Sequence, residues 1–195
     1  PPNPPIVSDI ITNDSTPVVS GTGEINASID FRIGAFFYET TVDGNGNWTI
    51  QITSSLGDSN YFYGVTATDA FGNESSEATA NLKVDTTPPV RPSIVNSVTT
   101  DQTPSITGTA EAGSTVSVTV DGSSYATTAN SGCSLIVTTT ALADGTYTVS
   151  ARATDAAVNE SSEGTDSLTV DSTPPTTPTV NALTTADTTP TITGT

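Results

Sequence analysis

The chain has 195 residues, with 21 Asp or Glu against four Lys or Arg, no His and a net charge of −17. Without histidine, enzymes lack their commonest general base and metal ligand. So few Lys and Arg exclude nucleic acid as a partner, because phosphate binding depends on clustered basic residues. The lone Cys133 cannot form a disulfide within the chain. Composition therefore argues against an enzyme and against a nucleic-acid-binding protein.

The residue types present favour short strands joined by tight turns. Thr, Ser, Ala, Gly, Asn and Val dominate, and 15 Gly and 13 Pro punctuate the chain. β-branched residues favour strands, and Gly and Pro favour turns. Apolar stretches extend over only a few residues, so we expect no membrane insertion in this segment. The composition predicts an all-β protein.

One sequence unit occurs twice and then begins a third time. The segment Val-Asp-Thr-Thr-Pro-Pro at 84–89 returns as Val-Asp-Ser-Thr-Pro-Pro at 170–175, an offset of 86. A Thr-Pro pair and, soon after it, a Gly-Thr pair recur in three registers, the latter beginning at Gly21, Gly108 and Gly194. Self-similarity of this kind identifies tandem structural repeats. It predicts repeat one at about 1–87, repeat two at about 88–173, and the opening strands of an incomplete third repeat, the stub, at 174–195.

Repeat one shows apolar alternation over 48–52 and 61–67, which predicts half-buried strands there. It also holds nine of the eleven aromatic residues. Alternation places Trp48 on the same side as Ile50 and Ile52, which favours a core position for this ring. The alternative is an exposed platform on which a sugar ring stacks.

Repeat two shows the same alternation at Val116, Val118 and Val120, and again over 147–153 and 168–170. Asp-Gly turn signals at 121–122 and 144–145 separate these segments. About seven strands in some 86 residues predict an immunoglobulin-like β-sandwich for each repeat.

Three further side chains have structural interpretations. Tyr61 and Tyr147 each follow a turn, where the tyrosine corner of an immunoglobulin-like fold is expected. Cys133 aligns with Asn47 of repeat one in an exposed turn, which indicates a neutral substitution. The alternative for this thiol is an intermolecular disulfide.

Several motifs of repeat two carry a family resemblance. They are the segments 103–116 (Thr-Pro-Ser-Ile-Thr-Gly-Thr-Ala-Glu-Ala-Gly-Ser-Thr-Val), 143–149 (Ala-Asp-Gly-Thr-Tyr-Thr-Val) and 153–156 (Ala-Thr-Asp-Ala), and the linker 170–175. The chain resembles the tandem bacterial immunoglobulin-like repeats of large surface adhesins and biofilm-associated proteins over essentially its whole length. The resemblance is strong for repeat two and the stub and weaker for repeat one, whose middle at 31–39 departs from the pattern. The resemblance implies extender modules that space a terminal binding domain from the cell surface, with calcium rigidifying the joints.

Three carboxylates are expected to converge between repeat one and repeat two. In the usual strand order of a seven-stranded sandwich, the loops after the second and sixth strands lie beside the incoming linker. In repeat two these loops contain Glu111 and Asp155, and the linker contributes Asp85. Oxygen-only ligands suit calcium, which takes about six to eight of them. Each Asp could instead bond its own turn, but three uncompensated carboxylates would repel one another, which favours calcium.

Equivalent carboxylates occur at the outer ends of the two repeats. Glu24 and Asp69 occupy the corresponding loops of repeat one, and Asp171 precedes the stub. Neither outer joint is complete within the sequence. We expect these three residues to serve calcium in the same way when a neighbouring repeat is present.

These observations predict a non-catalytic spacer located outside the cell, on a bacterial surface. Its expected partners are neighbouring repeats of the same chain and other copies of the protein. One alternative is a ligand-binding accessory module of a secreted protein, which recognises glycans through aromatic repeat one. The other alternative is a subunit of a strand-exchanged extracellular fibre.

Overall fold

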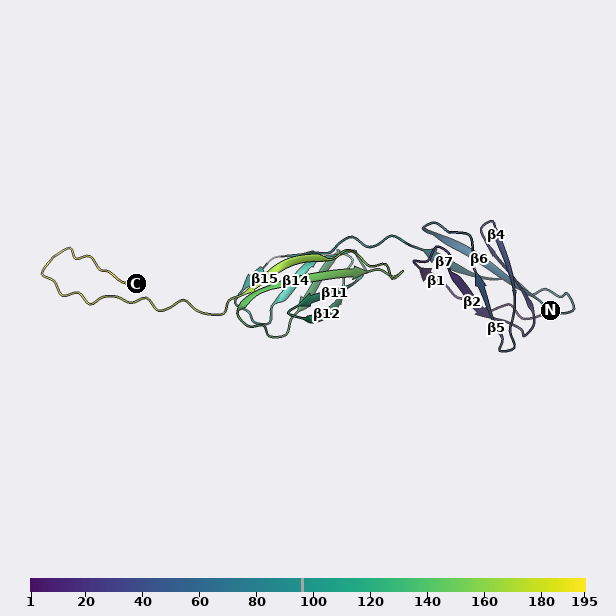
Figure 1. Cartoon of the computed structure of the whole chain (residues 1–195), viewed down its shortest axis with the longest axis horizontal. Coiled ribbons are helices and arrows are strands. Elements are labelled where there is room, and N and C mark those ends of the chain that lie inside the picture. Colours follow the sequence, from purple (N-terminus) through teal and green to yellow (C-terminus); the bar gives the residue numbers. More distant parts are fainter. Residues whose placement is uncertain (96) are drawn as a thin grey trace.

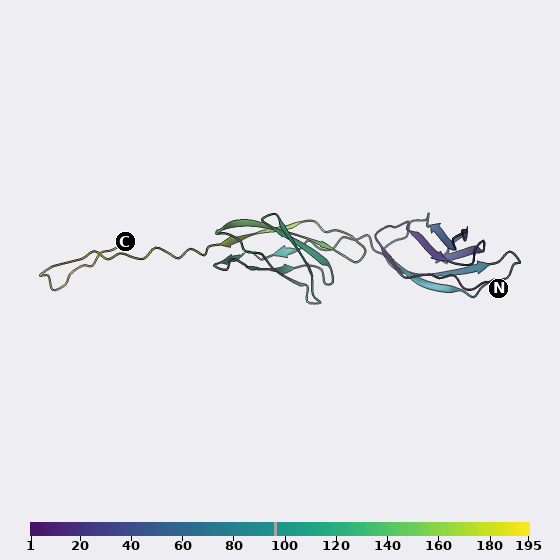
Figure 2. The ribbon, with the colours of Figure 1, turned by 90° about the horizontal axis from the view of Figure 1, so that it is seen from below.

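The computed structural model describes every residue except Asn96, and it consists of two β-sandwiches followed by an extended C-terminal segment (Figure 1). The sandwiches lie one after the other along the long axis in both views (Figure 2). The described residues contain no helix, and therefore none that is long and apolar enough to cross a membrane. The prediction of an all-β chain is confirmed.

The strands of repeat one, as far as the chain is described, form a five-stranded and a two-stranded sheet. The larger sheet has the order β1 (Ile10–Thr12), β7 (Ala78–Val84), β6 (Ser59–Thr68), β3 (Ser28–Ile33), β4 (Phe36–Thr41), and the smaller pairs β2 (Val18–Thr22) with β5 (Asn47–Gln51). β1 runs parallel to β7, and the other pairs are antiparallel.

Repeat two has the same arrangement, with one more short strand in its smaller sheet. Its larger sheet has the order β12 (Ser123–Thr128), β11 (Thr115–Val120), β14 (Gly145–Thr154), β15 (Gly164–Val170), β9 (Ser97–Thr99). The facing sheet has the order β13 (Ser134–Thr138), β10 (Ser105–Thr109), β8 (Ser93–Ile94). Two sandwiches with the same strand order follow from the sequence repeat, and each has the immunoglobulin-like architecture that was predicted.

Each sandwich encloses its own hydrophobic core. β11 buries Val116, Val118 and Val120 and turns the residues between them away from the core, because successive side chains of a strand point to opposite faces. In repeat one, the Trp48 side chain is 2% exposed and belongs to the core cluster. The predicted core position of Trp48 is confirmed, so this ring cannot serve as an exposed platform.

Both predicted tyrosine corners are confirmed. The Tyr61 hydroxyl donates to the carbonyl oxygen of Gly57 at 3.0 Å, and the Tyr147 hydroxyl donates to that of Ala143 at 2.9 Å. These bonds attach the start of β6 and of β14 to the turns that precede them. Each tyrosine therefore stabilises the fold.

The turn before β13 corrects one detail of the sequence alignment. Cys133 is exposed and has a φ of 63°. Its carbonyl accepts a hydrogen bond from Ala110 N, just as the carbonyl of Gly46 accepts one from Gly23 N. Cys133 therefore corresponds to Gly46, whose φ is 83°, and the expected match with Asn47 is wrong by one position. Both residues adopt the left-handed backbone that this turn requires.

The stub begins a third copy of the pattern. Val180 and Gly194 form an isolated antiparallel bridge, and backbone hydrogen bonds join Thr179 to Thr195 in both directions. An equivalent bridge joins Ile6 to Thr22 in repeat one. The side chains of the stub are exposed along its length. The boundaries at 87/88 and 173/174 stay predictions.

Candidate functional site at the joint between the repeats

The loop after β14 of repeat two contacts the linker that leaves repeat one. Asp155 Oδ1 accepts hydrogen bonds from Ala157 N at 2.8 Å and Asn159 N at 2.9 Å, which closes the loop. The Asn159 side chain is 7% exposed, and its Nδ2 donates both to Asp155 Oδ2 at 2.8 Å and to the backbone carbonyl of Asp85 at 2.6 Å. One amide group therefore ties a loop of repeat two to the linker.

A second hydrogen bond crosses the joint nearby. Asn13 Nδ2, in the turn between β1 and β2, donates to the carbonyl oxygen of Val158 at 3.2 Å. Val158 has a φ of 70°, which is unfavourable for a β-branched residue. Gly72 holds the corresponding position in repeat one, with a φ of 80°. The Val158 conformation persists because the hydrogen bonds of the loop hold it.

Lys83, at the end of β7, brings a positive charge to this joint. Its Nζ lies 2.9 Å from Asp85 Oδ2. The hydrogen bond to Asp85 and the charge of that carboxylate raise the pKa of Lys83, and the charges of Asp155 and Glu111 contribute in the same direction. The ammonium therefore lies in the field of all three carboxylates that were predicted to share calcium.

Asp155 stays ionised in this setting. Partial burial acts to raise the pKa of Asp155, but hydrogen bonds from the Asn159 amide and from the backbone of Asn159 and Ala157, with a smaller contribution from Lys83, lower it overall. A charged Asp155 is a strong acceptor, and so it orients the Asn159 amide that reaches the linker.

The linker itself is held from the side of repeat one. Asp58 Oδ1 accepts from Thr86 N at 3.0 Å and Thr86 Oγ1 at 2.8 Å, and Asp58 Oδ2 accepts from Thr87 Oγ1 at 2.7 Å. The hydroxyls of Thr87 and Thr86, with the Thr86 N–H, lower the pKa of Asp58. Asp144 binds Ser172 and Thr173 in the same way before the stub. The linker sequence Asp-Thr/Ser-Thr is thus a hydrogen-bonding motif for the Asp of the preceding turn.

The donors at the joint decide how well its carboxylates suit calcium. Among the residues described, no three Asp, Glu or Cys side chains are grouped to hold one metal ion. Both oxygens of Asp155 accept N–H donors, and Asp85 Oδ2 faces an ammonium group. Donor hydrogens and a positive charge stand where a calcium ion needs free lone pairs, so this arrangement does not fit an ion shared by Asp85, Glu111 and Asp155. Calcium binding in solution stays a prediction.

The three outer residues lie apart from this joint. Asp69 closes its own loop, accepting from Phe71 N at 2.8 Å and Asn73 N at 2.9 Å. Asp171 Oδ1 accepts from Thr173 N at 3.2 Å. Glu24 is exposed. The Asp contacts are those of turn-forming residues, the alternative that the sequence left open.

Sequence reasoning missed two of the donors at the joint. It gave Lys83 no role there, and the turn residue Asn13 carried no pattern that separates it from other polar loop residues. One signal for Lys83 was available, because it is the only lysine of the chain and lies two residues before the linker aspartate.

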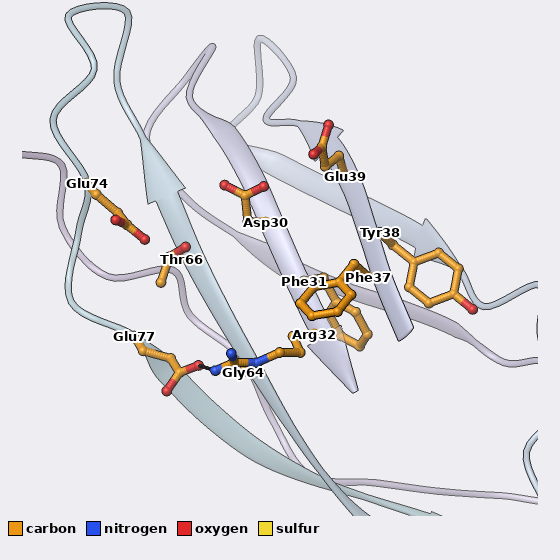
Figure 3. Close-up of a pocket in the computed structure, with 10 residues that line it drawn as sticks. All are labelled: Asp30, Phe31, Arg32, Phe37, Tyr38, Glu39, Gly64, Thr66, Glu74 and Glu77. Atoms are coloured by element: carbon orange, nitrogen blue, oxygen red, sulfur yellow. Dashed lines mark hydrogen bonds and ion pairs between the residues drawn. The ribbon is translucent and has the colours of Figure 1, made fainter. Parts of the chain in front are cut away.

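A hollow of about 200 Å³ lies elsewhere, on the outer face of β3, β4 and β6 in repeat one (Figure 3). Arg32 extends across it to Glu77, with Nη2 and Oε1 3.1 Å apart. The Phe37 ring beside it is 72% exposed. The other lining residues are Asp30, Phe31, Tyr38, Glu39, Gly64, Thr66 and Glu74. Acidic groups and one exposed ring therefore share this face.

Comparison with known sequences identifies one family. A family model for the bacterial Ig-like domain matches residues 6–86 and again 93–172. The two matches lie within the two sandwiches. A search of curated proteins found no match.

Solved structures with similar folds include adhesin repeats. A tetra-tandem repeat from the extending region of a large adhesion protein is 26% identical, with a TM-score of 0.41, and the alignment covers 89% of this chain and 50% of that one. A Ca²⁺-stabilized adhesin with which an Antarctic bacterium binds ice is 28% identical, with a TM-score of 0.42, over 90% and 49% of the two chains. The FN1–FN3 domains of chicken CNTN1 are 14% identical, with a TM-score of 0.55, over 87% and 65%. The chain thus spans about half the length of either adhesin structure.

Proposed function

Because the chain belongs to the bacterial Ig-like domain family, we propose that it is a non-catalytic extender segment of a bacterial surface adhesin or biofilm protein. Ig-like adhesin repeats are not generally enzymes. The observation that carries this proposal is the arrangement of two complete sandwiches in line, with a linker that hydrogen-bonds to both of them (Figure 1). An extracellular location on the bacterial surface is part of the same proposal.

The linker supports a spacer role because consecutive residues of it are fixed by hydrogen bonds to one repeat or the other. Thr86 and Thr87 bind Asp58 of repeat one, and the carbonyl of Asp85 binds Asn159 of repeat two. The two prolines that follow, at 88–89, limit φ and lack N–H donors, which stiffens the linker further. A stiff joint of this kind keeps successive repeats extended, so that each repeat adds its length to the whole.

Net charge supports the same role. Eleven acids against two bases give repeat one a charge of about −9, and nine acids against two bases give repeat two about −7. Rods with this charge repel one another and stay separate and soluble.

Copy number tests the spacer function directly. Residues 1–173 are inserted in one, two and four copies between a cell-surface anchor and an epitope tag, and the height of the tag above the membrane is measured by super-resolution microscopy. We expect an equal increment of height for each copy, and a monomeric mass for the isolated segment at every dilution. A height that does not grow with copy number would refute the extender function, and concentration-dependent association would favour the strand-exchanged fibre.

A second candidate function is ligand binding at the hollow on repeat one. The exposed Phe37 ring beside it favours this function, because an exposed aromatic face next to hydrogen-bonding groups is suited to stacking of a sugar ring. In repeat two the corresponding hollow is lined by Ser, Thr, Ala, Arg and Glu and has no aromatic residue.

A glycan array separates this function from a spacer alone. If the hollow binds a glycan, Phe37→Ala abolishes the signal, whereas Phe71→Ala, which removes a ring 91% exposed outside the hollow, leaves it unchanged. A spacer alone retains no glycan, so an array without signal would refute the second function.

A further inference from the structure

We propose that the joint carries its own cation, the ammonium of Lys83, and that this charge and the Asn159 amide together fix the angle between the repeats without calcium. The inference concerns how the proposed extender is held straight. It therefore deepens that function and rests on it.

Charge balance at the joint is the first step. Two repeats of like charge meet there, and the Asn159 amide brings Asp155 of repeat two next to the linker residue Asp85. Unbalanced, these groups would push the repeats apart. The Lys83 ammonium lies 2.9 Å from Asp85 Oδ2, and the two side chains are 46% and 27% exposed, so water screens the pair in part. This pair lies within repeat one, and the charges of Asp155 and Glu111 of repeat two also favour the charged form of Lys83, so the ammonium attracts acids across the joint.

Hydrogen bonds convert this attraction into a defined geometry. The charged Asp155 orients the Asn159 amide at 2.8 Å, and the amide donates to the carbonyl of Asp85 at 2.6 Å. The side chain of that same Asp85 binds Lys83. The last strand of repeat one, the linker and a loop of repeat two are thus joined by one continuous network. The Asn159 amide fixes the direction of the contact between the repeats, and the Lys83 ammonium balances the charge.

Comparison of equivalent positions shows that the fold itself does not require Lys83. The offset of 86 places Thr169 at the same position of β15, in the sequence Leu-Thr-Val-Asp, where repeat one has Leu-Lys-Val-Asp. The Thr169 hydroxyl only makes a hydrogen bond across the sheet, to Thr146 at 3.1 Å. β15 pairs along its length without a lysine. Lys83 is therefore a feature of this joint rather than of the repeat.

The loop that carries Asn159 has a counterpart at the outer end of repeat one. Asn73 occupies the corresponding loop of repeat one, and its Nδ2 donates to Asp69 Oδ2 at 2.8 Å, as Asn159 does to Asp155. Asn159 adds the bond to the linker. Both asparagines close their own loop, and Asn159 in addition joins its loop to the linker.

Residual dipolar couplings test the proposal, because two rigidly joined repeats report one alignment tensor and two mobile repeats report different ones. In chelator without calcium, we expect one tensor for the wild-type chain. Lys83→Met keeps an apolar stem and removes the charge, and it should split the tensors, whereas Lys83→Arg restores the charge and one tensor. Arg152→Met removes a surface cation that pairs within repeat two and serves as the control with one tensor.

The amide contribution is tested with a matched pair. Asn159→Ala and Asn73→Ala remove the same hydrogen bond within equivalent loops, but only Asn159→Ala also frees the carbonyl of Asp85. Only Asn159→Ala should split the tensors. Amide spectra in which each repeat keeps its dispersed signals show that both variants are folded.

Three outcomes would overturn the inference. Split tensors for the wild-type chain in chelator, merging at millimolar calcium, would identify calcium as the cation of the joint. One tensor for Lys83→Met in chelator would show that the prolines, and not the ammonium, hold the joint rigid. The same number of tensors for Asn159→Ala and Asn73→Ala would show that the bond from Asn159 to the linker does not fix the angle. None of these results bears on the copy-number experiment, so the inference and the extender function fail separately.

Discussion

Replacing Trp48 by Ala is expected to lower the free energy of unfolding of repeat one by about 3 to 5 kcal/mol, because a large buried side chain leaves a cavity that its surroundings fill only in part. The ring is 2% exposed within the core cluster, and its Nε1 donates to the carbonyl of Thr22 at 3.3 Å. Truncation removes both the packing and that hydrogen bond. Repeat two, whose core is separate, should keep its stability.

Chemical denaturation followed by the amide signals of each repeat measures this effect, since the variant lacks the tryptophan fluorophore. Phe71→Ala is the control, because its ring is 91% exposed and its loss should change stability by no more than about 0.5 kcal/mol. An unchanged midpoint for Trp48→Ala would show that the ring is not part of the core.

Gly108→Ala is expected to destabilise repeat two by about 1 to 3 kcal/mol, because a methyl group there has no space. Gly108 of β10 pairs with Ile94 of β8, and a Cβ at this glycine would overlap the backbone carbonyl of Ser93. Backbone cannot move aside as a flexible side chain can. The change therefore forces β8 away from β10.

The control for this variant is Gly145→Ala in the same repeat. A Cβ at Gly145 meets the Tyr147 side chain, with the hydroxyl oxygen 3.6 Å away, which is an ordinary contact. Melting curves of both variants give the comparison, and loss of the β8 to β10 amide cross-peaks locates the damage. Equal stability of the two variants would contradict a requirement for glycine at position 108.

The same close approach explains why Gly-Thr recurs in all three registers of the sequence. A Cβ at Gly21 would overlap the carbonyl of Ile6, and a Cβ at Gly194 would overlap that of Thr179. In each copy the first segment of the unit crosses the glycine of the Gly-Thr pair. The sequence displayed the recurrence, but the partner carbonyl lies about fifteen residues away, and only the fold shows it.

Local sequence patterns were sufficient to predict the core residues and the number of repeats. Alternation placed Trp48, Val116 and Val118 on buried faces, because the side chains of a strand alternate whatever the strand pairs with. The tyrosine corners were also predictable, since each hydroxyl bonds only four residues back along the chain. Short-range geometry of this kind depends on neighbouring residues alone.

The sequence by itself thus determined the sandwiches, their number and their buried faces. Tertiary structure alone decided what the linker residue Asp85 meets at the joint, because the bond from Asn159 to the carbonyl of Asp85 joins residues 74 apart and depends on how two folded modules dock. Carboxylates without a visible counter-charge pointed to calcium. The Lys83 ammonium pairs with Asp85 at 2.9 Å, and the docked modules bring Asp155 and Glu111 of repeat two into its field, because an electrostatic interaction depends on distance in space and not on distance along the chain.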